Sequence, residues 1–311
     1  MTELRDGVSF VVPVYNKAPY LPRVIEAIRN QAGDFAREYI FVDDGSTDDS
    51  LAIVRRLTAG WTDVLIHTQS NHGSAHATNQ GIARAGMAFI KFVDADDLLT
   101  DRATITLLEG LRGSPACLAF GQRQAYDTAE DLDLAIEAAH PRTHLISHPL
   151  KDALRNSFFN PTQILVRTDC AQAVGGCDER ITHSQEYSLA LRLARCWPFL
   201  EVDALITLRP REVPGSLGSS QSRQLRRVTL ACAYFLQDHP DIAAGLRRFA
   251  CRRAAGRAWK YARRHLGSGY GSRWFRLMLQ SQLGSLPDPS RFIAACAEAF
   301  DAAPAQPSAR P

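Results

Sequence analysis

The stretch Met87–Leu99, MAFIKFVDADDLL, decides how the rest of the chain is interpreted. Residues 89–93, apolar except for Lys91, are typical of a buried strand, and this strand runs directly into Asp94, Asp96 and Asp97. Neighbouring carboxylates repel one another and are costly to desolvate unless a cation or hydrogen-bond donors share their site. Oxygen ligands suit Mg2+ or Mn2+, and Mg2+ is commonly held by one or two carboxylates plus substrate phosphates. Alone, these acids also fit a solvated turn or a helix cap, so the metal interpretation depends on the segments before them.

Three earlier apolar segments are also followed by residues that could contact a ligand. Pro13 and Tyr15 follow Val8–Val12, Asp43 and Asp44 follow Tyr39–Val42, and Asn71 and Gly73 follow Val64–Ile66. Apolar residues recur at helical spacing between these segments, and alternating strands and helices predict a parallel sheet. Ligands of open parallel sheets bind beyond the carboxyl ends of the strands. We therefore expect these residues to converge with Asp94, Asp96 and Asp97.

Each of these residues also has a purely structural interpretation. Asp43 or Asp44 could cap the following helix, and Tyr15 could pack against the edge of the sheet. Gly73 and Gly81 could be ordinary turn and C-cap glycines. The first predicted strand is followed by neither a Walker A nor a GxGxxG sequence, so P-loop and dinucleotide-binding proteins lack their motifs here.

Composition sets the outer limits. The chain has 311 residues and a net charge of only +3, so it is not a general binder of polyanions. Its seven cysteines form no CxxC pair, which favours reduced thiols in a reducing compartment. We see neither an N-terminal apolar signal segment nor an apolar run of bilayer length. We expect a cytoplasmic protein, at most peripheral on the inner face of the membrane.

Four motifs carry a family resemblance. In chain order they are VVPVYN (11–16), FVDDGSTDDS (41–50), NHGSAHATNQG (71–81) and FVDADD (92–97). Together they resemble the inverting nucleotide-sugar glycosyltransferases of family 2, which have the GT-A fold. VGGCDE (174–179) and SQEYSLALR (184–192) extend the resemblance to about residues 7 to 215. It implies an α/β fold, with a GT-A-like (Rossmann-like), mostly parallel sheet flanked by helices.

The resemblance also implies roles for individual residues. Pro13 and Tyr15 would flank the base of the nucleotide, and Asp44 would accept hydrogen bonds from that base. The remaining residues implied in binding the nucleotide sugar are Asn71, Gly73, Asn79, Asp94 near the ribose, and Asp97 beside the sugar or metal.

The resemblance also implies which residue binds the metal ion and which acts as the general base. Asp96 would ligate the Mn2+ or Mg2+ through which the donor diphosphate is held. Glu186 would deprotonate the acceptor hydroxyl, as a general base on the face of the sugar opposite the leaving group. A structural alternative for Glu186 is an acid in the first turn of a helix capped by Ser184, favoured by the helix dipole.

Three departures from the family pattern affect the expected metal affinity and the expected rate of catalysis. Thr78 stands where many relatives have an arginine. No histidine occurs in residues 209–216, where many relatives complete the metal shell, so Glu212 or water would have to substitute. Glu186 is one methylene longer than the usual aspartate, and Gln185 precedes it. These departures leave open a catalytically weak protein that binds nucleotide or a partner through the same fold.

The chain divides by composition. We predict a GT-A-like domain over 1–218, with a nucleotide-binding half (7–110) and an acceptor-side half (111–218). A basic helical extension over 219–301 and a disordered tail over 302–311 would follow.

The predicted extension contains ten lysines or arginines and no acid between Arg247 and Arg276. Arg253, Arg257, Lys260 and Arg264 fall at helical spacing. Such a stretch with aromatic residues can lie on an anionic membrane, which would suit a lipid-linked acceptor. A solvated basic face is the alternative. No RNA-binding motif is present, and we expect no nucleic acid partner.

The expected function is metal-dependent, inverting transfer of a sugar from a nucleoside-diphosphate sugar to a hydroxyl acceptor. A UDP-sugar is the favoured donor by family frequency. The expected acceptor is a glycan, a lipid-linked saccharide or another precursor of a cell-surface glycoconjugate.

Overall fold

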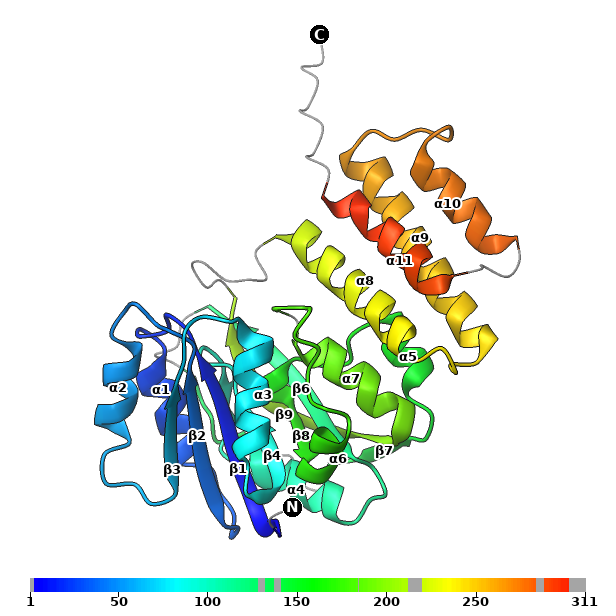
Figure 1. Cartoon of the computed structure of the whole chain (residues 1–311). Helices are drawn as coiled ribbons and strands as arrows, with labels where there is room; N and C mark the ends of the chain where they lie inside the picture. Colours follow the sequence, from blue (N-terminus) through cyan, green and yellow to red (C-terminus); the bar gives the residue numbers. More distant parts are fainter. Residues whose placement is uncertain are drawn as a thin grey trace. The chain divides into compact units, whose positions relative to one another are not determined.

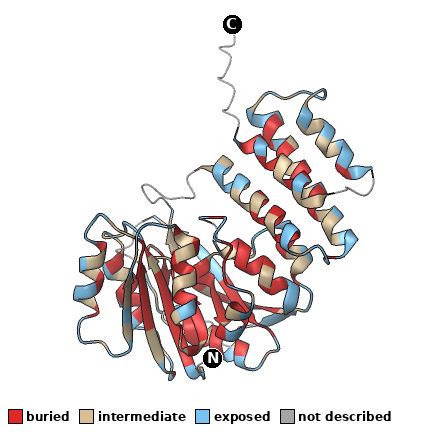
Figure 2. Cartoon of the chain, in the orientation of Figure 1, coloured by how far each residue is buried: buried red, intermediate tan, exposed pale blue. Residues whose placement is uncertain are grey.

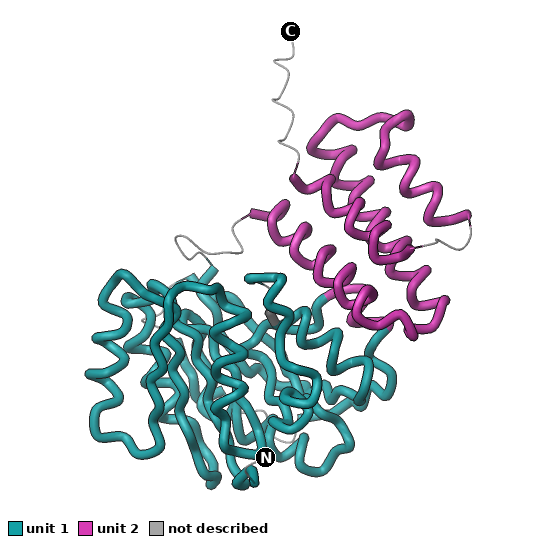
Figure 3. Tube along the Cα trace, in the orientation of Figure 1, with its two compact units in different colours: residues 1–150, 157–214 teal, residues 151–156, 215–311 magenta. Residues whose placement is uncertain are grey.

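The computed structural model describes residues 3–127, 132–136, 141–183, 185–211, 220–283 and 288–301. Ser184, Glu212 and the predicted tail 302–311 therefore lie outside the described residues. The chain forms two compact units (Figure 3). Unit 1 contains Met1–Leu150 and Ser157–Pro214, and unit 2 contains Lys151–Asn156 and Gly215–Pro311.

Unit 1 is built on one mixed sheet (Figure 1). Over the described residues it has nine strands in the order β3-β2-β1-β4-β8-β6-β9-β5, with β7 paired to β9. The strands are β1 (Arg5–Val14), β2 (Arg37–Asp43), β3 (Val64–Thr68), β4 (Met87–Phe92), β5 (Leu98–Leu99), β6 (Leu118–Tyr126), β7 (Thr143–Ile146), β8 (Ile164–Arg167) and β9 (Phe199–Pro210).

The parallel part of the sheet is the part that the sequence pattern predicts. β1 pairs in parallel with both β2 and β4, and β2 pairs in parallel with β3. The second half of the unit is mixed, because β8 is antiparallel to both β4 and β6, while β6 and β9 are parallel. The predicted α/β fold with a sheet flanked by helices is confirmed. Because β8 is antiparallel, the second half of the sheet is mixed, whereas the first half is parallel.

Helices cover both faces of this sheet. The helices are α1 (Leu21–Arg29), α2 (Ser50–Leu57), α3 (Ser74–Arg84), α4 (Ala103–Arg112), α6 (Thr168–Ala173) and α7 (Gln185–Cys196). Helix α3 packs on β1 and β2 and also contacts α6 and α7. Helices α1 and α4 pack elsewhere, against β5, β6 and β9. The central strands are buried from both sides (Figure 2), which explains their continuous apolar sequences.

Gly81 shows how closely α3 approaches β1. It lies inside the helix, so the alternative of a C-cap glycine is wrong. A Cβ atom at this position would come within 2.2 Å of Val11 Cγ1. The glycine is therefore required by packing, despite its low helix propensity.

Unit 2 is helical. It contains α5 (Leu150–Arg155, of which Leu150 belongs to unit 1), α8 (Gln221–Asp238), α9 (Ala244–His265), α10 (Arg273–Gln282), α11 (Pro289–Ala297) and the 3-10 helix η3 (Glu298–Phe300). Small side chains of α9, among them Ala250, Ala254 and Ala258, are buried where α8, α10 and α11 pack. Over the described residues, no helix is both long and apolar enough to span a bilayer.

Two arginines of α9 have a structural role. Arg253 and Arg257 both donate to the backbone carbonyl of Arg155 and to Asn156 Oδ1, at the end of α5. Cationic donors are favourable at a helix C-terminus, where carbonyls are left unpaired. Half of the predicted basic face thus holds a short helix in place.

Candidate active site

Three acids cluster in a tight turn at the carboxyl end of β4. The Asp97 amide donates to the Asp94 carbonyl at 3.0 Å, which closes the turn around the buried Ala95. Asp97 is buried, while Asp94 and Asp96 are partly exposed. The strand therefore delivers all three carboxylates to one edge of the sheet, as the sequence pattern predicts.

Burial and mutual repulsion disfavour ionisation of these acids. Burial, followed by the charges of Asp97, Asp96 and Glu186, raises the pKa of Asp94 well above its usual value. Burial and the charge of Asp96 raise the pKa of Asp97 to about 7. A cation in this cluster would relieve both effects.

Lys17 supplies one such cation. Its Nζ lies 2.5 Å from Asp96 Oδ2, and both side chains are mostly buried, with 23% and 18% exposed. Lys17 follows the VVPVYN motif, but sequence analysis did not identify it, because the pair spans 79 positions. A metal ion bound at Asp96 would have to displace this ammonium group.

The candidate metal ligands fit a divalent cation that also binds a substrate. All the candidate ligands are carboxylate oxygens, which suits Mg2+ or Mn2+. Within the described residues, no group of three His, Cys, Asp or Glu side chains could hold a metal ion. Diphosphate and water oxygens would therefore complete the coordination sphere. Glu212, the predicted substitute ligand, lies outside the described residues.

Lys91 anchors the strand that leads into the acidic turn. It is fully buried in β4, and its ammonium group donates to the carbonyls of Thr162 and Ile164. Burial lowers its pKa to about 7, whereas the charges of Asp97 and Asp94 act in the opposite direction. Thr162, in the 3-10 helix η1 (Pro161–Gln163), accepts from the Asp94 amide through its hydroxyl at 3.0 Å. The turn is therefore anchored to a distant segment that no motif predicts.

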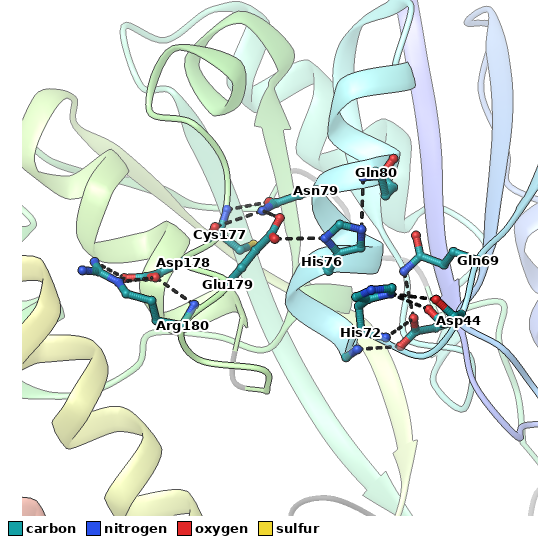
Figure 4. Close-up of polar contacts among 12 residues, drawn as sticks. Asp44, Gln69, His72, His76, Asn79, Gln80, Cys177, Asp178, Glu179 and Arg180 are labelled. Carbon is teal, nitrogen blue, oxygen red and sulfur yellow. Dashed lines mark hydrogen bonds and ion pairs between the residues drawn. The ribbon is translucent and has the colours of Figure 1, made fainter.

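Asp44 organises the loop that follows β3 (Figure 4). Its carboxylate accepts from the amides of His72 at 2.9 Å and Gly73 at 2.8 Å, and from Gln69 Nε2 at 2.8 Å. Gly73 has a φ of 92°, and a Cβ there would lie 2.9 Å from the Thr182 carbonyl oxygen. Asp44 and Gly73 are thus brought together, and their predicted contacts with a nucleotide stay predictions.

Three other residues predicted to bind the nucleotide sugar lie in or just beyond strands of the same sheet. Pro13 is the register partner of Val42, next to the pair Val14 and Asp43. Tyr15 follows β1 with 46% of its surface exposed, and Asn71 is exposed in the loop after β3. All of them lie at the carboxyl ends of parallel strands, which agrees with their predicted position.

Asn79 makes contacts of a different kind. Its Nδ2 donates to the Cys177 carbonyl at 3.0 Å and to Glu179 Oε1 at 2.7 Å, and its Oδ1 accepts from the Cys177 amide at 2.7 Å (Figure 4). The amide group is thereby committed to the VGGCDE segment. Its predicted role in donor binding stays a prediction.

Glu186 stands in the first turn of α7 and is partly buried. Burial raises its pKa to about 7, against the opposing charge of Arg123. Its own charge contributes to the raised pKa of Asp94, so the two carboxylates share one electrostatic environment. A carboxylate with this pKa can accept a proton near neutral pH, which is the requirement for a general base.

Two arginines complete the charge distribution. The charges of Arg209 (β9) and Arg123 (β6) both lower the pKa of Asp97. Sequence analysis missed both residues, because a single arginine within a strand carries no motif. Only the pairing of β6 with β9 brings them to this edge of the sheet.

Comparison with known proteins identifies the family. A sequence model described as Glycosyl transferase family 2 matches residues 9–175, more than half of the chain. The chain belongs to glycosyltransferase family 2. Among curated relatives, Glycosyltransferase GlyG of Streptococcus pneumoniae is 34% identical over 131 residues, which cover 42% of this chain and 42% of that protein. The match thus spans less than half of that relative.

Solved structures show the same fold. Residues 1–349 of S. aureus TarS align with a TM-score of 0.63 and 15% identity, covering 95% of this chain and 88% of that one. Mannosyltransferase PcManGT of Pyrobaculum calidifontis, in complex with GDP-Man and Mn2+, aligns with a TM-score of 0.55 and 17% identity, covering 97% and 87%. TarS 1–349 has also been solved with UDP-GlcNAc. At these identities the likeness concerns the fold, which is the GT-A-like fold of this family.

Proposed function

We propose that this family 2 protein is a metal-dependent inverting glycosyltransferase. It would move a sugar from a nucleoside-diphosphate sugar, with a UDP-sugar as the favoured donor, to a hydroxyl group. The acceptor would be a glycan, a lipid-linked saccharide or another precursor of a cell-surface glycoconjugate. The observation that carries the proposal is the shared electrostatic environment of Glu186 and the acidic turn after β4.

The nucleotide would lie at the carboxyl ends of β1 and β2, between Tyr15 and Asp44. One further atom supports this position. Asp43 Oδ1 is buried and has no hydrogen-bond partner among the described residues. A buried acceptor without a partner costs about 1–3 kcal/mol, so a donor group on a ligand would be favourable there.

Transfer would require proton removal and charge stabilisation at once. Glu186 would accept the proton of the acceptor hydroxyl as its oxygen attacks the sugar carbon. A bound divalent cation would supply Lewis-acid stabilisation of the departing diphosphate. Lys17 would be released from Asp96 when that cation binds, which leaves its ammonium group available to the diphosphate. The complexes of structural neighbours with UDP-GlcNAc, GDP-Man and Mn2+ support this choice of donor class and cofactor.

The test is sugar release or transfer from a panel of nucleotide sugars, with and without Mn2+. We expect Glu186→Gln to lower turnover by about 10²–10⁴-fold, which is the usual contribution of a general base. Asp96→Ala should lower turnover by about 10²-fold or more, because it removes a ligand of the ion that stabilises the transition state. Asp6→Ala is the matched control, since Asp6 is 75% exposed and pairs with Arg112.

Two outcomes would contradict parts of this proposal. Full turnover in either variant would remove that residue from the mechanism. Thermal stabilisation by UDP plus Mn2+, without sugar release from any donor, would favour the catalytically weak nucleotide-binding protein instead.

Peripheral membrane association is a separate proposal about unit 2. Lys260, Arg263 and Arg264 are exposed on α9, and none of them forms a hydrogen bond or ion pair with the described residues. Next to Lys260, the Trp259 ring contacts Tyr270 and Phe275 with centroids 5.9 and 5.1 Å apart.

Exposed apolar side chains accompany these cations. Tyr270, Leu279 and Leu283 are 69%, 44% and 84% exposed. Basic and apolar groups on adjacent helices match the surface of an anionic bilayer. We therefore propose that residues between Arg247 and Leu283 attach the protein peripherally to anionic lipid.

A further inference from the structure

Lys17 joins two segments at the carboxyl edge of the sheet. It follows β1, whereas Asp96 follows β4, and these two strands are parallel neighbours. The Lys17 ammonium group lies 2.5 Å from Asp96 Oδ2, and both side chains are mostly buried. Among the described residues, this is the one ion pair that the acidic turn makes. A positive charge of the protein itself therefore lies on the carboxylate that is proposed to ligate the metal ion.

The backbone that carries Lys17 is held in place by the segment after β2. The Lys17 amide donates to Ser50 Oγ at 2.8 Å, and the Thr47 amide donates to Asn16 Oδ1 at 2.8 Å. Asn16 has a φ of 51°, in the left-handed region that asparagine adopts more readily than most residues. These contacts fix the start of the Lys17 side chain. Its flexible four-carbon stem still lets the ammonium group move away from Asp96.

The ammonium group and a divalent cation compete for Asp96. Both are attracted to the same carboxylate, and two positive charges this close together repel each other. A metal ion can therefore bind at Asp96 only if Lys17 gives up its ion pair. In the absence of any other partner, that loss weakens the binding of the metal ion.

A diphosphate offers Lys17 a replacement partner. Mg2+ in proteins is commonly held by one or two carboxylates together with substrate phosphates. A diphosphate bound through an ion at Asp96 therefore lies next to the group that the Lys17 ammonium has just left. Lysine binds phosphate well as a point charge, and the fixed backbone keeps Lys17 within reach.

We propose that Lys17 exchanges partners, from Asp96 in the free protein to the donor diphosphate when the metal ion is bound. This partner exchange makes the binding of the cation and of the diphosphate depend on each other. By linkage, each ligand then strengthens the binding of the other by the same factor. The inference rests on the proposed function, because it takes Asp96 as the metal ligand and a nucleoside diphosphate as the leaving group.

Two dissociation constants of the full-length protein, measured at one fixed pH, test the partner exchange. The Kd for Mn2+ without nucleotide is obtained from the electron paramagnetic resonance signal of free Mn2+. The Kd for UDP in saturating Mn2+ is obtained by calorimetry. Lys17→Met should bind Mn2+ alone about tenfold more tightly, because the competing cation is gone. It should bind UDP about tenfold more weakly, because the diphosphate loses a charged hydrogen bond.

The opposite signs of these changes separate the partner exchange from a structural role. If Lys17 only stabilised its loop, removing the side chain would weaken the binding of both ligands. Lys151→Met is the matched control, since it removes an exposed lysine of unit 2 and should change neither constant. Lys17→Gln provides the same measurement if Lys17→Met does not fold.

Two results would overturn the inference. One is unchanged or weaker binding of Mn2+ alone to the Lys17 variants, and the other is an unchanged Kd for UDP in saturating Mn2+. Sugar release by the wild-type protein is measured in parallel. Mn2+-dependent release together with either contrary result would remove the partner exchange and keep the transferase function. No release from any donor, together with both expected changes, would remove the transferase function and keep the partner exchange.

Discussion

Glu186 is the residue on which the proposed chemistry depends most directly. It combines a position in the first turn of α7 with a carboxyl group that burial keeps protonated up to about neutral pH. The dipole at a helix N-terminus favours the ionised form, so burial outweighs it here. That balance distinguishes a candidate base from an ordinary acid at the start of a helix.

Turnover should therefore depend on pH. The pKa of Glu186 is raised to about 7, so the carboxyl group is protonated and inactive as a base below that pH and ionised above it. We expect kcat/KM for the donor to rise about tenfold per pH unit below 7 and to level off above it. The profile is measured in saturating Mn2+, because a bound cation keeps the acidic turn ionised. A flat profile between pH 5.5 and 8.5 would exclude Glu186 as the base.

At the scale of elements, the close contact between α3 and β1 fixes the position of segments at the carboxyl edge of the sheet. Helix α3 begins at the loop that Asp44 holds, and it carries Asn79, which binds the VGGCDE segment. A shift of this helix would therefore disturb both the predicted nucleotide-binding loops and the segment leading to α7. Gly81 permits the contact because it has no side chain.

Alanine substitutions of two helical glycines should have opposite effects. Gly81→Ala places a Cβ 2.2 Å from Val11 Cγ1, so we expect the free energy of unfolding to fall by about 1–3 kcal/mol. Gly256→Ala, inside α9, meets no atom within 4 Å, and its gain in helix propensity should raise stability by about 0.5–1 kcal/mol. Chemical denaturation of both variants measures the difference. Equal changes would mean that α3 does not pack on β1 this tightly.

At the scale of the whole molecule, one chain carries two units with different properties. Unit 1 contains the candidate active site. Unit 2 carries exposed apolar residues together with Lys260, Arg263 and Arg264, which are exposed and have no ion-pair partner among the described residues. Unit 2 also includes Lys151–Asn156, a segment from within the sequence of unit 1. The predicted domain boundary after residue 218 places these six residues in the first domain, whereas in the structure they group with unit 2.

The proposed membrane surface makes a prediction at this scale. The full-length protein should cosediment with vesicles of phosphatidylcholine and phosphatidylglycerol, but not with phosphatidylcholine alone. Because each basic residue near an anionic surface contributes about 1 kcal/mol, Lys260→Glu/Arg263→Glu should weaken binding by about tenfold or more. Arg55→Glu/Arg56→Glu, an exposed pair on α2, is the matched control. Asp96→Ala should bind vesicles as the wild type does, and equal binding by both charge variants would contradict the proposal.

Sequence alone determined the parallel half of the sheet, the family and the acidic turn. These features depend on short contiguous patterns: an apolar strand, the turn that ends it and the helix that follows. Asp44, Gly73 and Asp94–Asp97 could be found in this way, because each lies within the few residues that follow its own strand. Local chemistry specifies such positions.

Tertiary structure decided which distant residues meet these motifs. Lys17 pairs with Asp96, and Lys91 binds the carbonyls of Thr162 in η1 and Ile164 in β8. Arg123 comes to lie beside Arg209 only because β6 and β9 are neighbours. The physical reason is that charges interact through space, whereas strand order in a mixed sheet is set by the packing of the whole unit. The sequence shows which acids stand at the edge of the sheet, but only the fold shows which cations face them.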